Sequence, residues 1–180
     1  MESTLEQLKY PIGRYQKPEK FDPALLPEWI GVLKALPLWM DTCIENLDEA
    51  QLHIPYREGG WTIQQVVHHL ADSHMNAFIR VKLALTEDNP TISPYNEKVW
   101  AELADTKVVP VNISVTLLHG IHRRLLALLQ NMDPEDWQRT YYHPEHQRNF
   151  AIWEVIALYA WHSKHHFTQI IELRKKMNLY

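Results

Sequence analysis

The sequence predicts an all-α protein folded as a four-helix bundle with short extra helices. Four segments of roughly 18 to 25 residues repeat their apolar side chains at intervals of three and four, as one face of a helix requires. We find no convincing alternating strand pattern, no glycine-rich phosphate loop and no internal repeat. The chain has 180 residues, of which 46% are hydrophobic, so we expect a single domain over residues 1–180.

Charge and hydropathy argue against several classes of partner. A formal net charge of −4 and a pI near 6.2 give no electrostatic reason to expect nucleic acid or an anionic membrane. No apolar run approaches the roughly 20 residues that span a bilayer, and the N-terminus lacks a signal-peptide pattern, so we expect a cytoplasmic protein. The single cysteine, Cys43, fits a reducing compartment, and its place on an apolar helical stripe favours a core position over a nucleophile.

Residues 1–22 are expected to form an N-terminal arm over the surface, because proline and glycine break this segment too often for a helix. The first long helix then opens at Asp22-Pro23 or at Pro27, since proline is tolerated in a first turn, where its missing N–H costs nothing. Pro37 should kink this helix. Its apolar face consists of Trp29, Ile30, Leu33, Leu36, Met40, Cys43, Ile44 and Leu47.

The second long helix follows a turn-rich linker, "HIPYREGG", at residues 53–60. Thr62 and Gln65 have the spacing of a capping box, so the helix should begin there and run to about Leu85. The prolines of "EDNPTISPYN" then force extended backbone, after which "EKVWAEL" predicts a short helix.

The third long helix is expected over residues 114–132, although Gly120 weakens it by roughly 1 kcal/mol relative to alanine. A short helical turn at residues 133–134 and a loop or small hairpin in "RTYYHPEHQRNF" lead to the fourth long helix, residues 152–177. The link between the second and third helices has about 28 residues, far more than a tight turn needs, so it permits a crossover.

Eleven histidines are the compositional feature that stands out, because imidazole is a common metal ligand. On a helical wheel, His162 and His166 of "WHSKHH" lie together in the middle of the apolar stripe, whereas His165 lies at its edge. Imidazoles at i and i+4 can share a metal ion, and two core histidines bonded to carbonyls or water explain the pattern about equally well. Ser163 and Lys164 replace the glutamate of the zinc-protease motif H-E-x-x-H, so a third ligand must come from another helix.

The second helix offers three histidines in "VVHHLADSHMNAFIR". His74 lies on the apolar stripe, while His68 and His69 flank the stripe on opposite sides, and geometry alone does not choose between those two. His68 has Asp72 beside it, which is typical of a solvated or salt-bridged flank. Near His69 lie three polar residues, Ser73, Asn76 and Arg80, which suit the wall of a pocket and favour His69 over His68 as a ligand. A solvated helix face explains these residues equally well.

The other histidines have weaker patterns. His119 and His122 form an i, i+3 pair on the third helix, but two arginines adjoin it, so packing and surface roles are favoured over metal binding. His143 and His146 in the loop and His53 in the linker are expected at the surface.

Several segments together resemble the YfiT-like branch of the DinB superfamily. They are "YPIGRY", the stretch from "PYREGGWTIQQVVHHLADSHMN" to "EKVWAEL", "YYHPEH" and "YAWHSKHHFTQI", so the similarity runs from about residue 10 to the end. The double histidine followed by "LADSHMN" is the most specific of these, whereas H-x-x-x-H alone would be weak.

This resemblance implies a four-helix bundle of up-down-down-up order, which the long crossover allows. It also implies one divalent zinc- or nickel-type ion per subunit, bound by His69, His162 and His166. Members are cytoplasmic homodimers usually described as metal-dependent hydrolases, and some are regarded as S-transferases that add the low-molecular-weight thiol bacillithiol to electrophiles.

Three functions remain open, and we place them in order. The first is a hydrolase in which the ion activates water. Because no carboxylate stands out on the core faces of helices two and four, hydrolysis would rely on metal hydroxide or on an imidazole such as His165 or His74. The second is a thiol S-transferase, in which Asn76 and Arg80 would orient carboxylate or sugar groups of the thiol. The third is a non-catalytic metal-binding bundle. Asn76, Arg80 and His165 are thus the candidate catalytic residues, and the expected partner is a small-molecule substrate such as a thiol.

Overall fold

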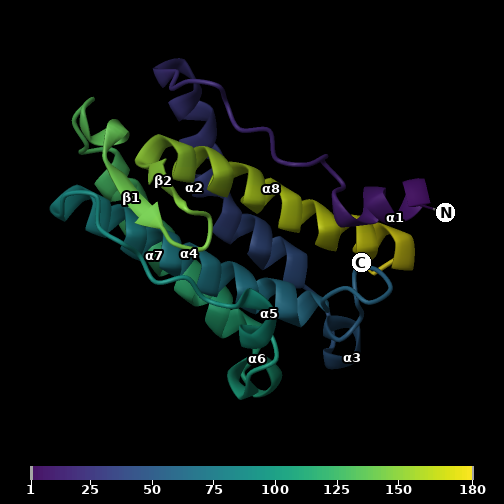
Figure 1. The fold of residues 1–180 in the computed structure, drawn as a ribbon. Helices are drawn as coiled ribbons and strands as arrows, with labels where there is room; N and C mark the ends of the chain where they lie inside the picture. The colour runs from purple at the N-terminus through teal and green to yellow at the C-terminus, as the bar shows by residue number, and fades with distance from the viewer. Residues whose placement is uncertain (1, 180) are drawn as a thin grey trace.

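Four long helices make up the computed structural model, which describes residues 2–179 (Figure 1). They are α2 (Leu26–Ile44), α4 (Ile63–Thr86), α7 (Val111–Leu129) and α8 (Ile152–Met177). The shorter elements are α1 (Glu2–Lys9), α3 (Glu49–Leu52), α5 (Glu97–Trp100), α6 (Ala104–Val108), the strands β1 (Thr140–His143) and β2 (Arg148–Ala151), and 3₁₀ turns at Pro23–Leu25 and Asp136–Gln138.

Helices α4 and α7 are parallel. His68 bonds to Ser114, and further along both helices His74 bonds to His122. The segment with α5 and α6 therefore has to return along the length of α4 before α7 can begin (Figure 1). This explains why the link between the second and third long helices is so much longer than a tight turn.

Helix α8 is antiparallel to α4 and α2 is parallel to α8. Along α8 and α4, His162 faces His69 while the earlier Tyr159 faces the later Ser73. Contacts between α2 and α8 run in the same direction along both helices. Trp39 stacks on Phe167, and further along both helices Arg174 donates to the carbonyls of Thr42 and Cys43. The order is therefore up-down-down-up, and the predicted fold class is confirmed.

Local signals placed most of the long helices. Thr62 Oγ1 accepts a bond from the Gln65 N–H at 3.1 Å, and Gln65 Oε1 accepts one from the Thr62 N–H at 3.0 Å, so α4 begins with the predicted capping box. Asp22 likewise caps the turn before α2 by accepting a bond from the Ala24 N–H. Cys43 is completely buried, as predicted. Pro37 lies inside α2 without ending it.

Two expectations about short elements were wrong. Residues 2–9 form α1, where no helix was expected, because the proline and glycine that break the arm come only at Pro11 and Gly13. Only residues 10–22 form the extended arm, which runs along α8 (Figure 1). Helix α6 was also missed, because Gln64 of α4 holds it through a 2.7 Å bond to the Thr106 carbonyl, a contact with no local sequence signal. The hairpin predicted after the third helix is confirmed as β1 and β2.

Apolar side chains form two clusters along the bundle, one toward the hairpin and one toward the opposite end. Residues 72–76 of α4 and 161–169 of α8 contribute no buried apolar side chain to either cluster. The buried histidines of both helices lie in or next to this gap, so the polar site is built between two apolar layers. No described helix is both long and apolar enough to cross a bilayer.

Candidate metal centre

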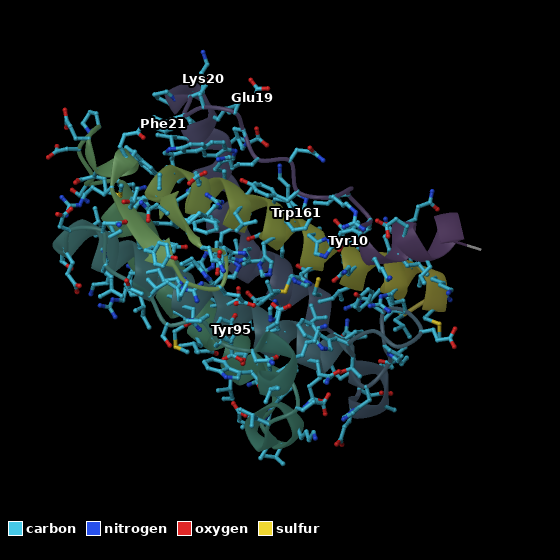
Figure 2. The ribbon with its side chains drawn as sticks, viewed as in Figure 1. Tyr10, Glu19, Lys20, Phe21, Tyr95 and Trp161 are labelled. Atoms are coloured by element: carbon cyan, nitrogen blue, oxygen red, sulfur yellow. The ribbon has the colours of Figure 1, made fainter. Side chains whose placement is uncertain are left out.

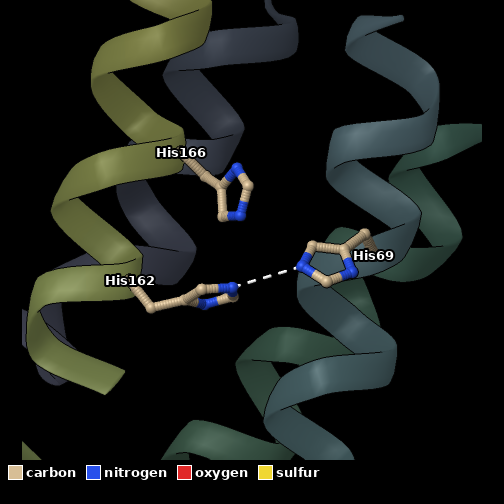
Figure 3. Close-up of side chains that lie close together, drawn as sticks. All are labelled: His69, His162 and His166. Carbon is tan, nitrogen blue, oxygen red and sulfur yellow. Dashed lines mark hydrogen bonds between the residues drawn. The ribbon is translucent and has the colours of Figure 1, made fainter. Parts of the chain in front are cut away.

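Three histidine side chains converge between α4 and α8 (Figure 3). His69 Nε2 lies 3.2 Å from His162 Nε2, and one nitrogen from each of His69, His162 and His166 lies within 4.8 Å of the nitrogens of the other two. His69 and His166 are buried, and His162 is half-buried. His162 and His166 meet because they are one turn apart on the same face of α8, as the helical wheel predicted.

The ring of His166 is held by Gln169, one turn further along α8. His166 Nδ1–H donates to Gln169 Oε1 at 2.8 Å, which leaves His166 Nε2 free to bind an ion. The Gln169 amide nitrogen donates in turn to His165 Nε2 and to the Lys9 carbonyl, both at 3.0 Å. Sequence reasoning missed Gln169, although its i+3 spacing from His166 could have indicated it.

The three imidazoles are neutral at pH 7. Burial, with a smaller effect from His165, lowers the pKa of His69 to about 4, and burial lowers the pKa values of His162 and His166 well below their usual range. Each ring therefore has a lone pair available, and no carboxylate shares the cluster among the described residues. Three neutral imidazoles, one of them already oriented by a second residue, suit a borderline divalent ion such as Zn²⁺ or Ni²⁺.

The helical wheel placed His165 at the edge of the apolar stripe and did not show what covers it. It is buried, because the N-terminal arm covers it: its ring stacks on Trp161 at 4.6 Å and lies 5.8 Å from Tyr10. Figure 2 shows Tyr10 and Trp161 beside the same part of α8. A wheel of α8 alone cannot contain this contact, since the arm is more than a hundred residues away in the chain.

His68 is also not on a solvated flank. It is buried against α7, where its ring nitrogens bond to Ser114 Oγ at 2.7 Å and to the Val109 carbonyl at 3.1 Å. The two adjacent histidines of α4 thus face different neighbours: His68 faces α7, and His69 faces α8.

The histidines of α7 have the packing and surface roles that were predicted. His122 is buried and bonds to the Leu33 carbonyl at 2.6 Å and to His74 at 3.0 Å. His119 lies at the surface and pairs with Asp41.

A cavity of about 730 Å³ reaches the candidate metal centre at His162. Its walls come from α4, α8, the segment around α5 and the turn of the hairpin: Ser73, Arg80, Pro94, Tyr95, Asn96, Glu97, Lys98, His143, Glu145, His146, Leu158, Tyr159 and His162. Ser73 and Arg80, two of the three polar residues predicted to line a pocket, are among them. Asn76 is not, since its side-chain amide donates to the Asp72 carbonyl in its own helix at 2.9 Å.

Arg80 is the most deeply placed cation of this cavity. Only 9% of the residue is exposed; its guanidinium donates to the Ser93 carbonyl at 3.3 Å and lies 5.9 Å from the ring centre of Tyr95, which Figure 2 labels. No carboxylate of the described residues lies within 4.0 Å of it. A guanidinium in this position has donors left for an anionic group of a ligand.

The hairpin and the crossover supply cavity residues that the sequence did not reveal. His143, expected at the surface, is buried beside His146 with ring centres 4.4 Å apart, because the hairpin folds back on the bundle. Glu97 and Glu145 also line the cavity. Burial raises the pKa of Glu97, the charge of Lys98 partly offsets this, and the charge of Glu145 raises the pKa further. All of these lie in loops or short elements, where no periodicity could have indicated them.

The fold and the site together define a four-helix bundle with three converging histidines that could hold a metal ion, one of which, His162, lines a polar cavity. The profile of the DinB superfamily matches residues 40–170, and the chain belongs to this superfamily. Two relatives are named "Putative metal-dependent hydrolase". The one from Geobacillus kaustophilus is 44% identical over 97% of this chain and 98% of its own, and the one from Oceanobacillus iheyensis is 46% identical over 93% and 96%.

Solved structures agree with this assignment. YfiT from Bacillus subtilis, described as "a probable metal-dependent hydrolase with an unusual four-helix bundle topology", has a TM-score of 0.93 at 43% identity, covering 97% of this chain and 99% of YfiT. The four-helix bundle protein TT2238 has a TM-score of 0.54 at 19% identity, covering 81% of this chain and 98% of its own, and shows similarity of fold alone.

Proposed function

We propose that this chain is a metal-dependent hydrolase that holds one Zn²⁺ or Ni²⁺ ion per subunit on His69, His162 and His166. The observation that carries the proposal is the convergence of three neutral histidine nitrogens next to a polar cavity, which they reach at His162. The names of the relatives support the same activity. When bound at such a site, the ion lowers the pKa of water toward 7 and polarises a carbonyl group.

The residues of this chain would position the substrate and receive a proton. Arg80 would bind an anionic group of the substrate in the cavity, with Tyr95 beside its guanidinium. The Glu97 carboxylate is the better-placed proton acceptor, because it lines the cavity and its raised pKa is closer to neutrality. His165 is less suited, since its Nε2 already accepts a bond from Gln169 and it does not line this cavity.

A thiol S-transferase is the second candidate. The absence of a carboxylate from the described histidine cluster favours it, because a thiolate needs no protein base in order to attack an electrophile. Arg80 would then orient a carboxylate of the thiol substrate. The electrophile would form a carbon–sulfur bond to the thiolate and release its leaving group.

Metal analysis combined with a reaction screen tests these proposals. Purified wild-type protein should contain about one divalent ion per chain, and His69→Ala, His162→Ala and His166→Ala should each lose most of it. His119→Ala, which removes a surface histidine, should retain the ion. Unchanged metal content in all three ligand variants would contradict the site.

The metal-loaded protein is then assayed with esters and amides and with a thiol plus a model electrophile. Metal-dependent hydrolysis supports the first function. Metal-dependent conjugation without hydrolysis would overturn it in favour of thiol transfer. Metal that raises the free energy of unfolding but supports neither reaction would indicate a structural ion.

A further inference from the structure

Several buried ring nitrogens near the candidate metal centre, His165 Nδ1 among them, have no hydrogen-bond partner among the described residues, and two of these belong to neighbouring rings that approach each other between α4 and α8. They are Nδ1 of His162 and Nε2 of His74. His74 is completely buried, and the ring centres of the two residues are 5.6 Å apart. An unsatisfied buried polar atom costs roughly 1 to 3 kcal/mol, so two neighbouring ones need an explanation.

The bonds of His122 fix which nitrogen of His74 carries the proton. The Leu33 carbonyl can only accept, so His122 Nδ1 donates to it at 2.6 Å. Burial lowers the pKa of His122 to about 4, so the ring is neutral and its Nε2 is an acceptor. His74 Nδ1 must therefore donate across the 3.0 Å contact with His122 Nε2. A neutral His74 then has a bare lone pair on Nε2, which seeks a donor.

The chemistry of His162 supplies the complementary atom. Its Nε2 faces His69 Nε2 at 3.2 Å, so Nε2 is the nitrogen that would bind an ion. A neutral imidazole that binds an ion through Nε2 carries its proton on Nδ1, which is the nitrogen without a partner.

We propose that His74 is a positioning residue for the metal centre: its Nε2 accepts a hydrogen bond from His162 Nδ1–H when the ion is bound. The result is a directed chain in which His162 donates to His74, His74 to His122, and His122 to the Leu33 carbonyl. The inference rests on the proposed metal site but not on which reaction the site catalyses.

The distances allow this bond after a small movement. The ring centres of His74 and His162 are 5.6 Å apart. This is close to the 5.3 Å between the ring centres of His69 and His162, whose facing nitrogens are 3.2 Å apart. The alternative acceptor is the Tyr159 hydroxyl, but its oxygen already donates to the Ser73 carbonyl and accepts from Ser73 Oγ.

Nuclear magnetic resonance of the wild-type protein, labelled with ¹⁵N-histidine and loaded with Zn²⁺, tests the chain without any mutation. We expect a proton on His162 Nδ1 and a nitrogen–nitrogen coupling through the hydrogen bond to His74 Nε2, with a second coupling from His74 Nδ1 to His122 Nε2. Zn²⁺ bound by the three ligands with His162 Nδ1 uncoupled would overturn this proposal alone. A protein that does not bind Zn²⁺ would contradict the metal site as well.

Zinc affinity, measured by competition with a chelator, gives a second readout. His74→Leu should weaken Zn²⁺ binding by about 10- to 100-fold, the usual effect of losing a partner of a metal ligand. His74→Gln, whose amide oxygen can accept from His162 Nδ1–H, should recover part of the affinity. His68→Leu is the matched control, because it removes a buried histidine of the same helix that faces α7. Equal losses in His74→Leu and His74→Gln, or in His68→Leu, would indicate a general packing effect and overturn the proposal.

Discussion

Gln169 shows how a single side chain can order the candidate metal centre. Its carboxamide oxygen accepts from His166, and its nitrogen donates to His165 and to the Lys9 carbonyl. The last two bonds hold the carboxamide in the orientation in which it can fix the ring of His166. We expect Gln169→Leu to weaken Zn²⁺ binding by about 10- to 100-fold, because His166 loses the acceptor that fixes its tautomer.

Chelator competition measures this effect, with Gln130→Leu as control because Gln130 is exposed at the end of α7. Equal zinc affinity in Gln169→Leu and the wild type would show that Gln169 does not orient the ligand.

Arg80 provides a test of the cavity at the same scale. Since its guanidinium has no carboxylate partner within 4.0 Å among the described residues, Arg80→Gln should raise KM by about 10- to 100-fold for an anionic substrate. Metal content should not change, because Arg80 is not a ligand. Steady-state kinetics on the substrate found in the screen check this, and Arg124→Gln, an exposed arginine stacked on Phe78, is the control. An unchanged KM would exclude Arg80 from substrate binding.

The N-terminal segment is the element whose role was hardest to foresee. Through the Lys9 carbonyl and the ring of Tyr10 it covers Gln169 and His165, although it precedes the bundle in the chain. Deleting residues 1–10 should lower the free energy of unfolding by about 1 to 3 kcal/mol, because the buried Gln169 amide loses an acceptor.

Urea unfolding followed by circular dichroism measures this loss. Glu6→Ala, which breaks only the exposed pair with Arg14, should have little effect. A deletion as stable as the full chain would mean that residues 1–10 do not contribute to the stability of the fold.

At the scale of the whole molecule, buried histidines should make the metal-free protein sensitive to acid. Burial lowers the pKa of His122 to about 4 from 6.5, so below pH 6.5 the unfolded state binds a proton that the folded state does not. The contribution of such a histidine to the free energy of unfolding is therefore fully present above pH 6.5. It falls by about 1.4 kcal/mol per pH unit as the pH drops toward 4.

Urea unfolding at several pH values in the presence of a chelator measures the slope. His122→Gln should reduce it, since one proton-binding group is removed. A slope unchanged by this replacement, or stability that rises as the pH falls, would contradict the prediction.

The sequence by itself determined the four long helices and one side of the site. Hydrophobic periodicity and the capping box at Thr62 located α4, and the i, i+4 spacing placed His162 and His166 on one face of α8, because both signals are local. The same periodicity placed His68 and His69 on opposite flanks of one stripe without distinguishing them.

Only the tertiary structure decided which flank faces the other ligands. Helix α8 packs on the side of His69, and α7 packs on the side of His68. It also decided that the arm buries His165 and that the crossover and the hairpin supply Glu97 and His143 to the cavity. These placements depend on contacts between segments far apart in the chain, and the periodicity of a single helix carries no information about which neighbour will cover each of its faces.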